Sequence, residues 1–295
     1  MSLVASSPGS SDDPRSRPGR KLGPIAEGVG TAHRAWLEPV RDRYFASGLT
    51  VSDLARKAGW SKSKVSELLR GTGLYPSWEF TYGLLHVLGM PTWPMRRLWS
   101  AAAREACKKQ EWIDGCIEKV VLSTGPDRPP VDHRAFADIN AAAYLSYAGV
   151  FVSPADADRI ADEAFDVLWL RWEEALRSAN LRKFAWQFLR RGVMARTPHI
   201  DGRPQLGPAA FDTVALHQAP AYRKFAQIEE SLALFQAVSR LPDPQLDVIV
   251  LIHLRGMSHT QAAEVLGVPH AFVCSAERHA KRSLTTALSP GENRP

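Results

Sequence analysis

Cysteine is scarce in this sequence. Only three of its 295 residues are cysteines, Cys107, Cys116 and Cys274. Thiols spaced this widely form neither the disulfide framework of a small secreted protein nor the close-set pairs of a zinc site. We therefore expect free, mostly buried thiols and no bound metal.

Long apolar runs are also absent. The longest, around Val248 to Ile252, is far shorter than the roughly 20 residues needed to span a membrane. The segment from Met1 to Arg20 is rich in serine, proline and aspartate and has no apolar core, which excludes a secretory signal. These absences predict a protein of the reducing cytoplasm with no membrane partner.

Catalytic patterns are missing as well. The sequence contains no phosphate-binding loop and no paired nucleophile and base, and its nine histidines are scattered. Four of them fall near the C-terminus at a spacing that matches no known ligand set: His253, His259, His270 and His279. We therefore predict that the chain is not an enzyme and has no cofactor.

Two segments, in contrast, each carry the pattern of a helix, a tight turn and a second helix. In the first segment Thr50 is suited to cap a helix, and Gly59 supplies the permissive backbone of the turn. Ser61 then caps a second helix, whose apolar residues at helical spacing must face inward. The side chains left on its outer side are Lys62, Ser63, Lys64, Ser66, Glu67 and Arg70. A polar helix of this kind is suited to the major groove of DNA.

The second segment runs from Gly256 to Leu284. Ser258 is its capping residue, Gly267 makes the turn, and Pro269 takes an early position in the next helix, where its missing N–H costs little. Its outer face carries only a small basic patch, formed by Arg278, Lys281 and Arg282.

Positive charge is concentrated around the first segment. The chain has a net charge of +6, and residues 31–120 carry 14 basic and 9 acidic side chains, whereas residues 226–295 carry 6 and 7. Because lysine and arginine supply nonspecific affinity for DNA by neutralising phosphates, the first segment is the better candidate for binding DNA by itself.

The spacing of apolar residues predicts an all-α protein of several domains, with no convincing strand. The proposed divisions follow the Pro- and Gly-rich stretches. They are a disordered tail (1–30), a helix-turn-helix domain with a helical extension (31–124), a helical middle domain (132–197), a linker (198–225), a second helix-turn-helix domain (226–288) and a tail (289–295).

Two helices of the middle domain carry candidate binding residues. The first begins after Ser153 and places on its outer face Asp156, Asp158, Asp162, Glu163 and Asp166. The second, from about residue 178 to residue 196, mixes aromatic and basic side chains that could grip single-stranded DNA: Arg182, Lys183, Trp186 and Arg190. Both patterns are also typical of ordinary surface and core helices.

Residues 36–90 resemble the phage-repressor and Cro type of helix-turn-helix domain. The resemblance rests on Leu54-Ala55, Gly59, Ser61, Val65-Ser66, Gly71 and Pro76. It implies that Lys62, Ser63, Lys64 and Glu67 face bases, and that Thr50, Ser52 and Arg70 lie near phosphates.

The rest of the chain resembles a sigma factor of the extracytoplasmic-function type. The run from Asp156 to Trp169 and the pair Ala185-Trp186 are similar to its second region, and Leu241-Pro242, Gln245, Gly256, Ser258, Ala262-Ala263 and Leu266-Gly267-Val268 are similar to its fourth. The resemblance implies that the acidic helix face docks on core RNA polymerase. The chain departs from the family at the start of the last reading helix, where Phe272, Cys274 and Ala276 replace polar and basic residues. We therefore expect the last domain to bind DNA poorly by itself.

Together these features predict a bacterial, cytoplasmic transcription regulator. Its repressor-type domain would bind double-stranded DNA, and its sigma-like body would contact RNA polymerase or partner proteins. Two alternatives remain: a working sigma factor that initiates transcription, and a sigma mimic that acts as a scaffold by occupying an anti-sigma-like protein.

Overall fold

The structure, a computed structural model, describes residues 22–120, 128–207 and 232–288. These residues form helices and one short hairpin, so the predicted all-α class is confirmed. Residues 22–120, here called the N-terminal domain, contain α1 (Thr31–Ala46), α2 (Val51–Ala58), α3 (Lys62–Arg70), α4 (Trp78–Leu88), α5 (Thr92–Glu105) and α6 (Gln110–Glu118).

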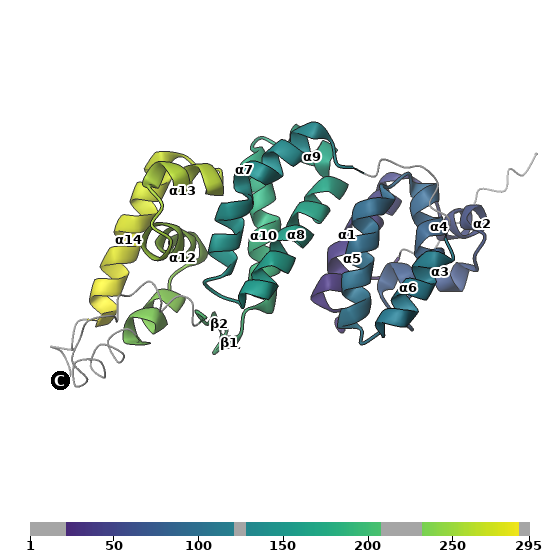
Figure 1. Cartoon of the computed structure of the whole chain (residues 1–295), viewed down its shortest axis with the longest axis horizontal. Helices are drawn as coiled ribbons and strands as arrows, with labels where there is room; N and C mark the ends of the chain where they lie inside the picture. Colours follow the sequence, from purple (N-terminus) through teal and green to yellow (C-terminus); the bar gives the residue numbers. More distant parts are fainter. Residues whose placement is uncertain (1–21, 121–127, 208–231, 289–295) are drawn as a thin grey trace, which may run out of the picture.

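The remaining described residues are here called the body. Their first part contains α7 (Val131–Ala148), α8 (Pro154–Leu170), α9 (Trp172–Arg177), α10 (Leu181–Arg196), β1 (His199–Ile200) and β2 (Arg203–Pro204). Residues 232–288, the C-terminal unit, contain α12 (Asp243–Ile249), the π-helical turn η2 (Val250–Leu254), α13 (His259–Leu266) and α14 (His270–Leu288). The parts follow one another along the long axis, with α2 and α3 near one end and α14 at the other (Figure 1).

The N-terminal domain is built around large aromatic side chains. Trp36, Trp78 and Trp99 are fully buried together with the leucines of α1, α3 and α4. Their polar atoms are partly satisfied inside the core: the Trp36 indole donates to the Tyr75 hydroxyl at 3.3 Å, and that hydroxyl donates to the carbonyl of Trp99 at 2.6 Å. These bonds tie α1 and α5 to the loop that follows α3.

The predicted tail over residues 1–30 is wrong for residues 22–30. Val29 is buried in the core of the N-terminal domain, and the amide of Ala26 donates to the carbonyl of Arg70 at 2.9 Å. Arg34 holds the same segment by donating to the carbonyls of Ala26 and Val29. The segment therefore supports the C-terminal end of α3. The tail predictions for residues 1–21 and 289–295 lie outside the described residues.

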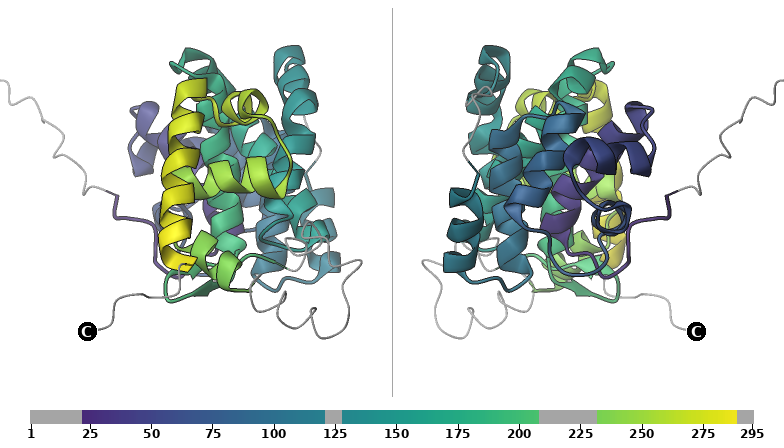
Figure 2. Two further views of the ribbon diagram at one scale, coloured as in Figure 1. Left: turned by 90° about the vertical axis from the view of Figure 1, so that its left-hand side faces the viewer. Right: turned by 90° about the vertical axis from the view of Figure 1, so that its right-hand side faces the viewer.

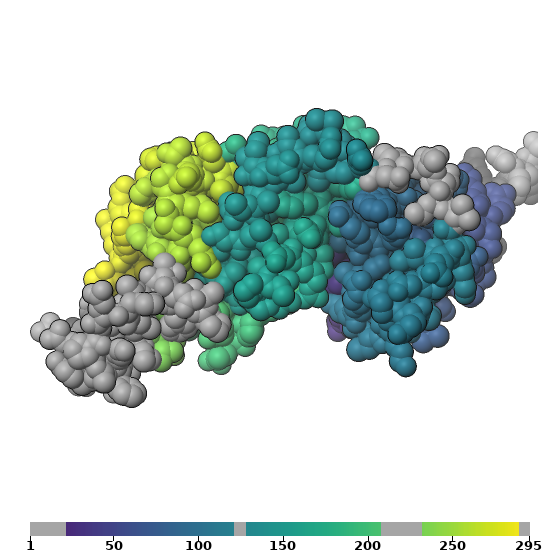
Figure 3. All heavy atoms as spheres, in the orientation of Figure 1, coloured from purple at the N-terminus to yellow at the C-terminus, as the bar shows by residue number. Residues whose placement is uncertain are grey.

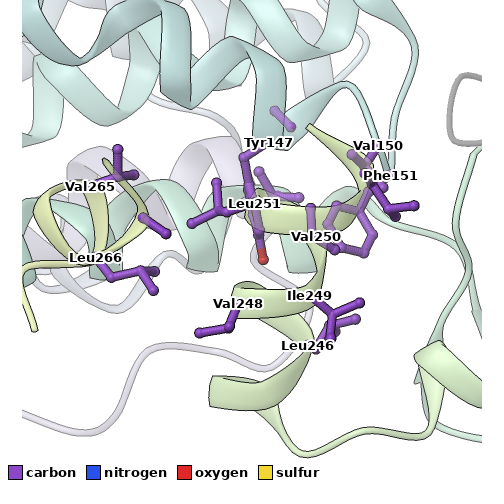
Figure 4. Close-up of a cluster of buried hydrophobic side chains, with 14 of the residues drawn as sticks. Tyr147, Val150, Phe151, Leu246, Val248, Ile249, Val250, Leu251, Val265 and Leu266 are labelled. Atoms are coloured by element: carbon purple, nitrogen blue, oxygen red, sulfur yellow. The ribbon is translucent and has the colours of Figure 1, made fainter. Parts of the chain in front are cut away.

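The larger apolar core of the body crosses the predicted boundary between its middle and last domains, whereas a smaller one around Trp172 lies within the middle helices. Tyr147 in the last turn of α7 and Val150 and Phe151 just after it face the buried residues of α12 and η2. Val265 and Leu266 of α13 belong to the same cluster (Figure 4). The middle helices and the C-terminal unit therefore pack as a single unit.

The N-terminal domain meets the body through a more polar contact. Side chains of α1 and α5 form ion pairs with side chains of α8 and α10. They also pair with Arg171, which joins α8 to α9. The three ion pairs are Arg97–Asp166, Arg171–Asp42 and Arg191–Glu38. Val167 adds an apolar contact. Figure 3 shows the two surfaces meeting across this junction.

The short hairpin corrects the expectation that no strand forms. Asp201 and Gly202 both have positive φ, at 52° and 71°, and this geometry reverses the chain so that β1 pairs with β2. The hairpin falls in the first part of the predicted linker, and residues 208–225 of that linker lie outside the described residues.

Two glycines of the N-terminal domain allow the packing of residues 22–30 on α3 to be tested. Gly59 and Gly71 both have positive φ, at 73° and 65°. A Cβ at residue 59 would meet nothing within 4 Å, but at residue 71 it would lie 2.4 Å from Cγ2 of Val29. We expect Gly59→Ala to lower the free energy of unfolding by about 1–2 kcal/mol and Gly71→Ala by about 1–3 kcal/mol more. Urea unfolding of the full chain measures both, and equal losses would contradict the packing.

Candidate nucleic-acid interface

The local sequence positions α2 and α3 as predicted. Thr50 and Asp53 form a reciprocal capping box, in which the Asp53 amide donates to the Thr50 hydroxyl at 3.1 Å. Gly59 takes the left-handed conformation and ends α2, and the Ser61 hydroxyl accepts from the amide of Lys64 at 3.4 Å. Both helix starts and the turn between them are therefore fixed by short-range contacts.

The inner faces of the two helices anchor them on the domain. Leu54 and Ala55 of α2 and Val65 and Leu69 of α3 are buried in the aromatic core. Two helices that are held in this way keep a constant angle to each other. A constant angle is needed if α3 is to enter a groove while α2 lies across the DNA backbone.

The outer face of α3 is polar and open. The side chains of Lys62, Ser63, Lys64 and Glu67 are exposed, and Ser66 is half-buried. The ammonium of Lys64 lies 5.2 Å from the centre of the Trp60 ring, within the range of a cation–π contact. Seen from this end of the molecule, the N-terminal domain faces the viewer and the C-terminal unit lies behind it (Figure 2, right).

The three predicted phosphate contacts differ in their availability. Ser52 is exposed in the first turn of α2. The Thr50 hydroxyl already donates to the carboxylate of Asp53 at 2.6 Å, and Arg70 is half-buried, with its Nε donating to the carbonyl of Ser66 at 3.3 Å. The amides at the start of α2 therefore offer a better phosphate contact than the Thr50 side chain.

The second helix pair, α13 and α14, begins with the same local geometry. Ser258 and Gln261 form a capping box, with amide-to-side-chain distances of 2.9 and 3.2 Å, and Gly267 takes the left-handed conformation. The surroundings of the two turns differ. A Cβ at Gly59 would point into open space, whereas one at Gly267 would lie 2.3 Å from the amide nitrogen of Lys183. The second turn is therefore packed against the start of α10.

The outer face of α14 is mixed. Phe272 is 43% exposed, and Arg278, Lys281 and Arg282 are exposed near the middle of the helix. The helix itself lies at the end of the molecule that faces the viewer in Figure 2, left. The Lys281 ammonium also contacts the carboxylate of Glu277 at 2.8 Å, so part of this small basic patch is neutralised within the chain.

Two histidines that are scattered in the sequence meet at one carboxylate. His253 and His259 contact the two oxygens of Glu277 at 2.8 and 2.7 Å. Hydrogen bonds from Lys281 and His259 lower the pKa of Glu277 to about 2. The cluster joins η2, α13 and α14, and no pattern in the sequence points to it, because the three residues share no local spacing.

The acidic face of α8 is narrower than predicted. Asp158 and Asp162 are exposed, and Asp156 is half-buried, with its pKa lowered by a hydrogen bond from Ser153 and by Arg159. Asp166 is only 3% exposed, and Glu163 is buried as well. The prediction that both lie on an outer face was wrong, because other parts of the chain pack over both positions. Arg97 pairs with Asp166 there, and Arg196 pairs with Glu163.

Burial changes the acidity of both covered carboxyls. The pKa of Asp166 is raised to about 7 by desolvation, against the opposing effect of Arg97. The pKa of Glu163 is raised for the same reason, with Arg196 opposing it. Asp166 therefore serves the junction with the N-terminal domain and is not available to another protein.

The aromatic and basic helix α10 also faces inward. The Trp186 side chain is buried, and its indole donates to Asp247 at 3.3 Å, so the expectation that it could stack on a base was wrong. Arg190 is bound to Asp243 and Asp247. Arg182 pairs with Glu264 at 3.5 Å, and the side chain of Lys183 is exposed.

Neither a membrane-spanning helix nor a metal-binding cluster occurs among the described residues. None of their helices is long and apolar enough to cross a membrane. Within the same ranges, no three side chains of histidine, cysteine, aspartate or glutamate gather in a way that could hold a metal ion.

Comparison with known proteins identifies the first helix pair. Residues 19–98 match the family model of a helix-turn-helix domain. The match includes α2 and α3, and it also includes residues 22–30, which support α3. None of the curated proteins compared with the chain matches it. The N-terminal domain thus contains a helix-turn-helix domain, a fold typical of DNA-binding regulators.

Proposed function

We propose that this chain is a transcription regulator that binds duplex DNA by placing α3 in the major groove. The observation that carries the proposal is the open polar face of α3, held at a fixed angle to α2 by the caps and the buried residues of the two helices. The body leaves this end of the molecule uncovered (Figure 1).

Each part of the surface has a role suited to its chemistry. Lys62, Ser63, Lys64 and Glu67 face the groove, where lysine can donate to guanine and neutralise the flanking phosphates, and glutamate can accept from cytosine. Ser52 and the first amides of α2 bind phosphate, and Arg70 supports the end of α3. Ser61 and Ser66 complete the surface, Ser61 as the cap that aims the first turn at the DNA. Lys64 exchanges its weak contact with Trp60 for one with DNA.

The proposal predicts that Lys62 and Lys64 carry much of the affinity. In the full chain, K62A/K64A should weaken binding to duplex DNA. The slope of log affinity against log salt should fall by roughly 0.9 for each phosphate that the variant no longer neutralises. Fluorescence anisotropy with a labelled duplex at several salt concentrations measures both quantities.

The matched control removes two cations from the body. R134A/R177A makes the same change in net charge at exposed residues of α7 and α9. Equal losses in the two variants would mean that only net charge matters, which would contradict a binding surface on α3.

For the body, we propose a protein contact through the exposed part of α8. The resemblance to sigma factors suggests core RNA polymerase as the partner, and Asp158 and Asp162 remain open for it. The alternative of a working sigma factor is less well supported, because Arg182, Arg190 and Trp186 of α10 are bound to carboxylates inside the body. The alternative of a mimic that occupies an anti-sigma-like protein would use the same acidic residues.

Charge reversal tests this contact. D158K/D162K should abolish retention of core RNA polymerase by the immobilised full chain and leave the thermal midpoint nearly unchanged, since exposed charges contribute little to stability. E111K/E118K, the same reversal at exposed residues of α6, is the control. Polymerase retained equally by all three proteins would rule out α8 as the docking surface.

A further inference from the structure

A pocket lies at the junction between the N-terminal domain and the body. Helix α1 forms one side of it, and α8 and α10 form the other. Its volume is about 170 Å³, and its walls are mostly apolar, with Ala35 and Pro39 on α1, Ile160 and Val167 on α8, and Phe188 on α10. An apolar cavity of about 150 Å³ is large enough to admit a benzene ring. The junction pocket therefore has room for one small aromatic molecule.

The cations around the junction pocket limit the charge of such a molecule. Four arginines line it, and each is already bound within the chain. Arg34 donates to backbone carbonyls, Arg171 and Arg191 pair with carboxylates of α1, and Arg196 pairs with Glu163. A carboxylate ligand would have to displace one of these partners, and the guanidinium groups would repel a cation. An uncharged ligand fits this surrounding best.

Glu163, which also lines the junction pocket, has one oxygen without a donor. Its Oε2 accepts from Nη2 of Arg196 at 2.6 Å, whereas its Oε1 is buried and accepts no hydrogen bond from any residue that the structure describes. The side chain is only 10% exposed. Because a buried acceptor that lacks a donor is unfavourable, a donor supplied by a ligand would be bound strongly here.

We propose that the junction pocket binds a small uncharged aromatic molecule with one hydrogen-bond donor, of the phenol type. The ring packs on the apolar walls, and the hydroxyl donates to Oε1 of Glu163. Because the bound molecule contacts α1, α8 and α10 together, it holds the N-terminal domain more firmly on the body. This inference goes beyond the proposed function, which depends on the open faces of α3 and α8.

Three ligands of similar size test the chemistry of the junction pocket. They are para-cresol, toluene and 4-methylbenzoate, which carry a donor, no polar group and a negative charge. Isothermal titration calorimetry with the full chain at pH 8, which favours the ionised form of Glu163, measures the three affinities. We expect para-cresol to bind about tenfold more tightly than toluene, because its hydroxyl donates to a buried charged acceptor, and 4-methylbenzoate to bind most weakly.

Two variants test the place of binding. A35L fills the pocket from α1 and should abolish binding of para-cresol. A135L adds the same side chain at an exposed residue of α7 and should bind as the unaltered chain does. Thermal unfolding followed by circular dichroism shows that both variants fold.

E163Q tests the donor bond without changing the size of the side chain. Glutamine has one acceptor oxygen, which Arg196 takes, so the preference for para-cresol over toluene should fall below about threefold. This comparison remains decisive if A35L does not fold. No binding of para-cresol to the unaltered chain, equal affinities for para-cresol and toluene, tightest binding of 4-methylbenzoate, or unchanged binding in a folded A35L would each overturn the proposal.

Discussion

The buried carboxylate of Asp247 determines how the body is put together. It accepts hydrogen bonds from α7, through Tyr147, and from α10, through Trp186 and Arg190. Burial raises its pKa, and Arg190 opposes that shift. Removing one partner of a buried charge pair commonly costs about 3–5 kcal/mol, because the other charge stays buried without compensation. Helices α7, α10 and α12 therefore cannot separate without exposing a charged group or leaving it unpaired.

This constraint divides the molecule into parts with different roles. Around Asp247 the body is closed by a continuous apolar cluster, in which each large side chain that is fully buried contributes roughly 1.5–3 kcal/mol. The junction with the N-terminal domain combines unlike contacts. The pair Arg191–Glu38, with side chains exposed by 67% and 38%, is of a kind that contributes only about 0–1 kcal/mol. Asp166, which pairs with Arg97, and the side chain of Val167 are covered by packing and hold the two parts more firmly.

The pairs α2–α3 and α13–α14 have similar local sequences, but the turn of the first is open and the turn of the second is covered by α10. Thr50 and Ser258 both begin capping boxes, and Gly59 and Gly267 both make left-handed turns. These features follow from residues within a few positions of one another, so the sequence is sufficient to predict them. What lies against each turn depends on distant parts of the chain. Of these two turns the first is left open, and no local pattern distinguishes it from the second.

Burial of charged and aromatic residues is harder to predict for the same reason. The helical spacing of α8 correctly separates its apolar residues from its acids, but Asp166 is covered because Arg97, far away in the sequence, neutralises it. Trp186 is inside because its indole finds a carboxylate on α12. Residues 22–30 contain few core-forming side chains, yet the buried Val29, the partly buried Leu22 and Ile25 and the bond from the Ala26 amide to the Arg70 carbonyl dock them on the domain. Periodicity identifies a face, and tertiary contacts decide what covers it.

Hydrogen exchange of the full chain, with and without a duplex that it binds, tests the central claim most directly. If α3 reads DNA while the body stays closed, the amides of residues 50–71 should exchange more slowly in the complex, and those of α10, α12 and α13 should exchange at the same rate in both states. New protection confined to α14, or faster exchange of α10 on binding, would contradict the account.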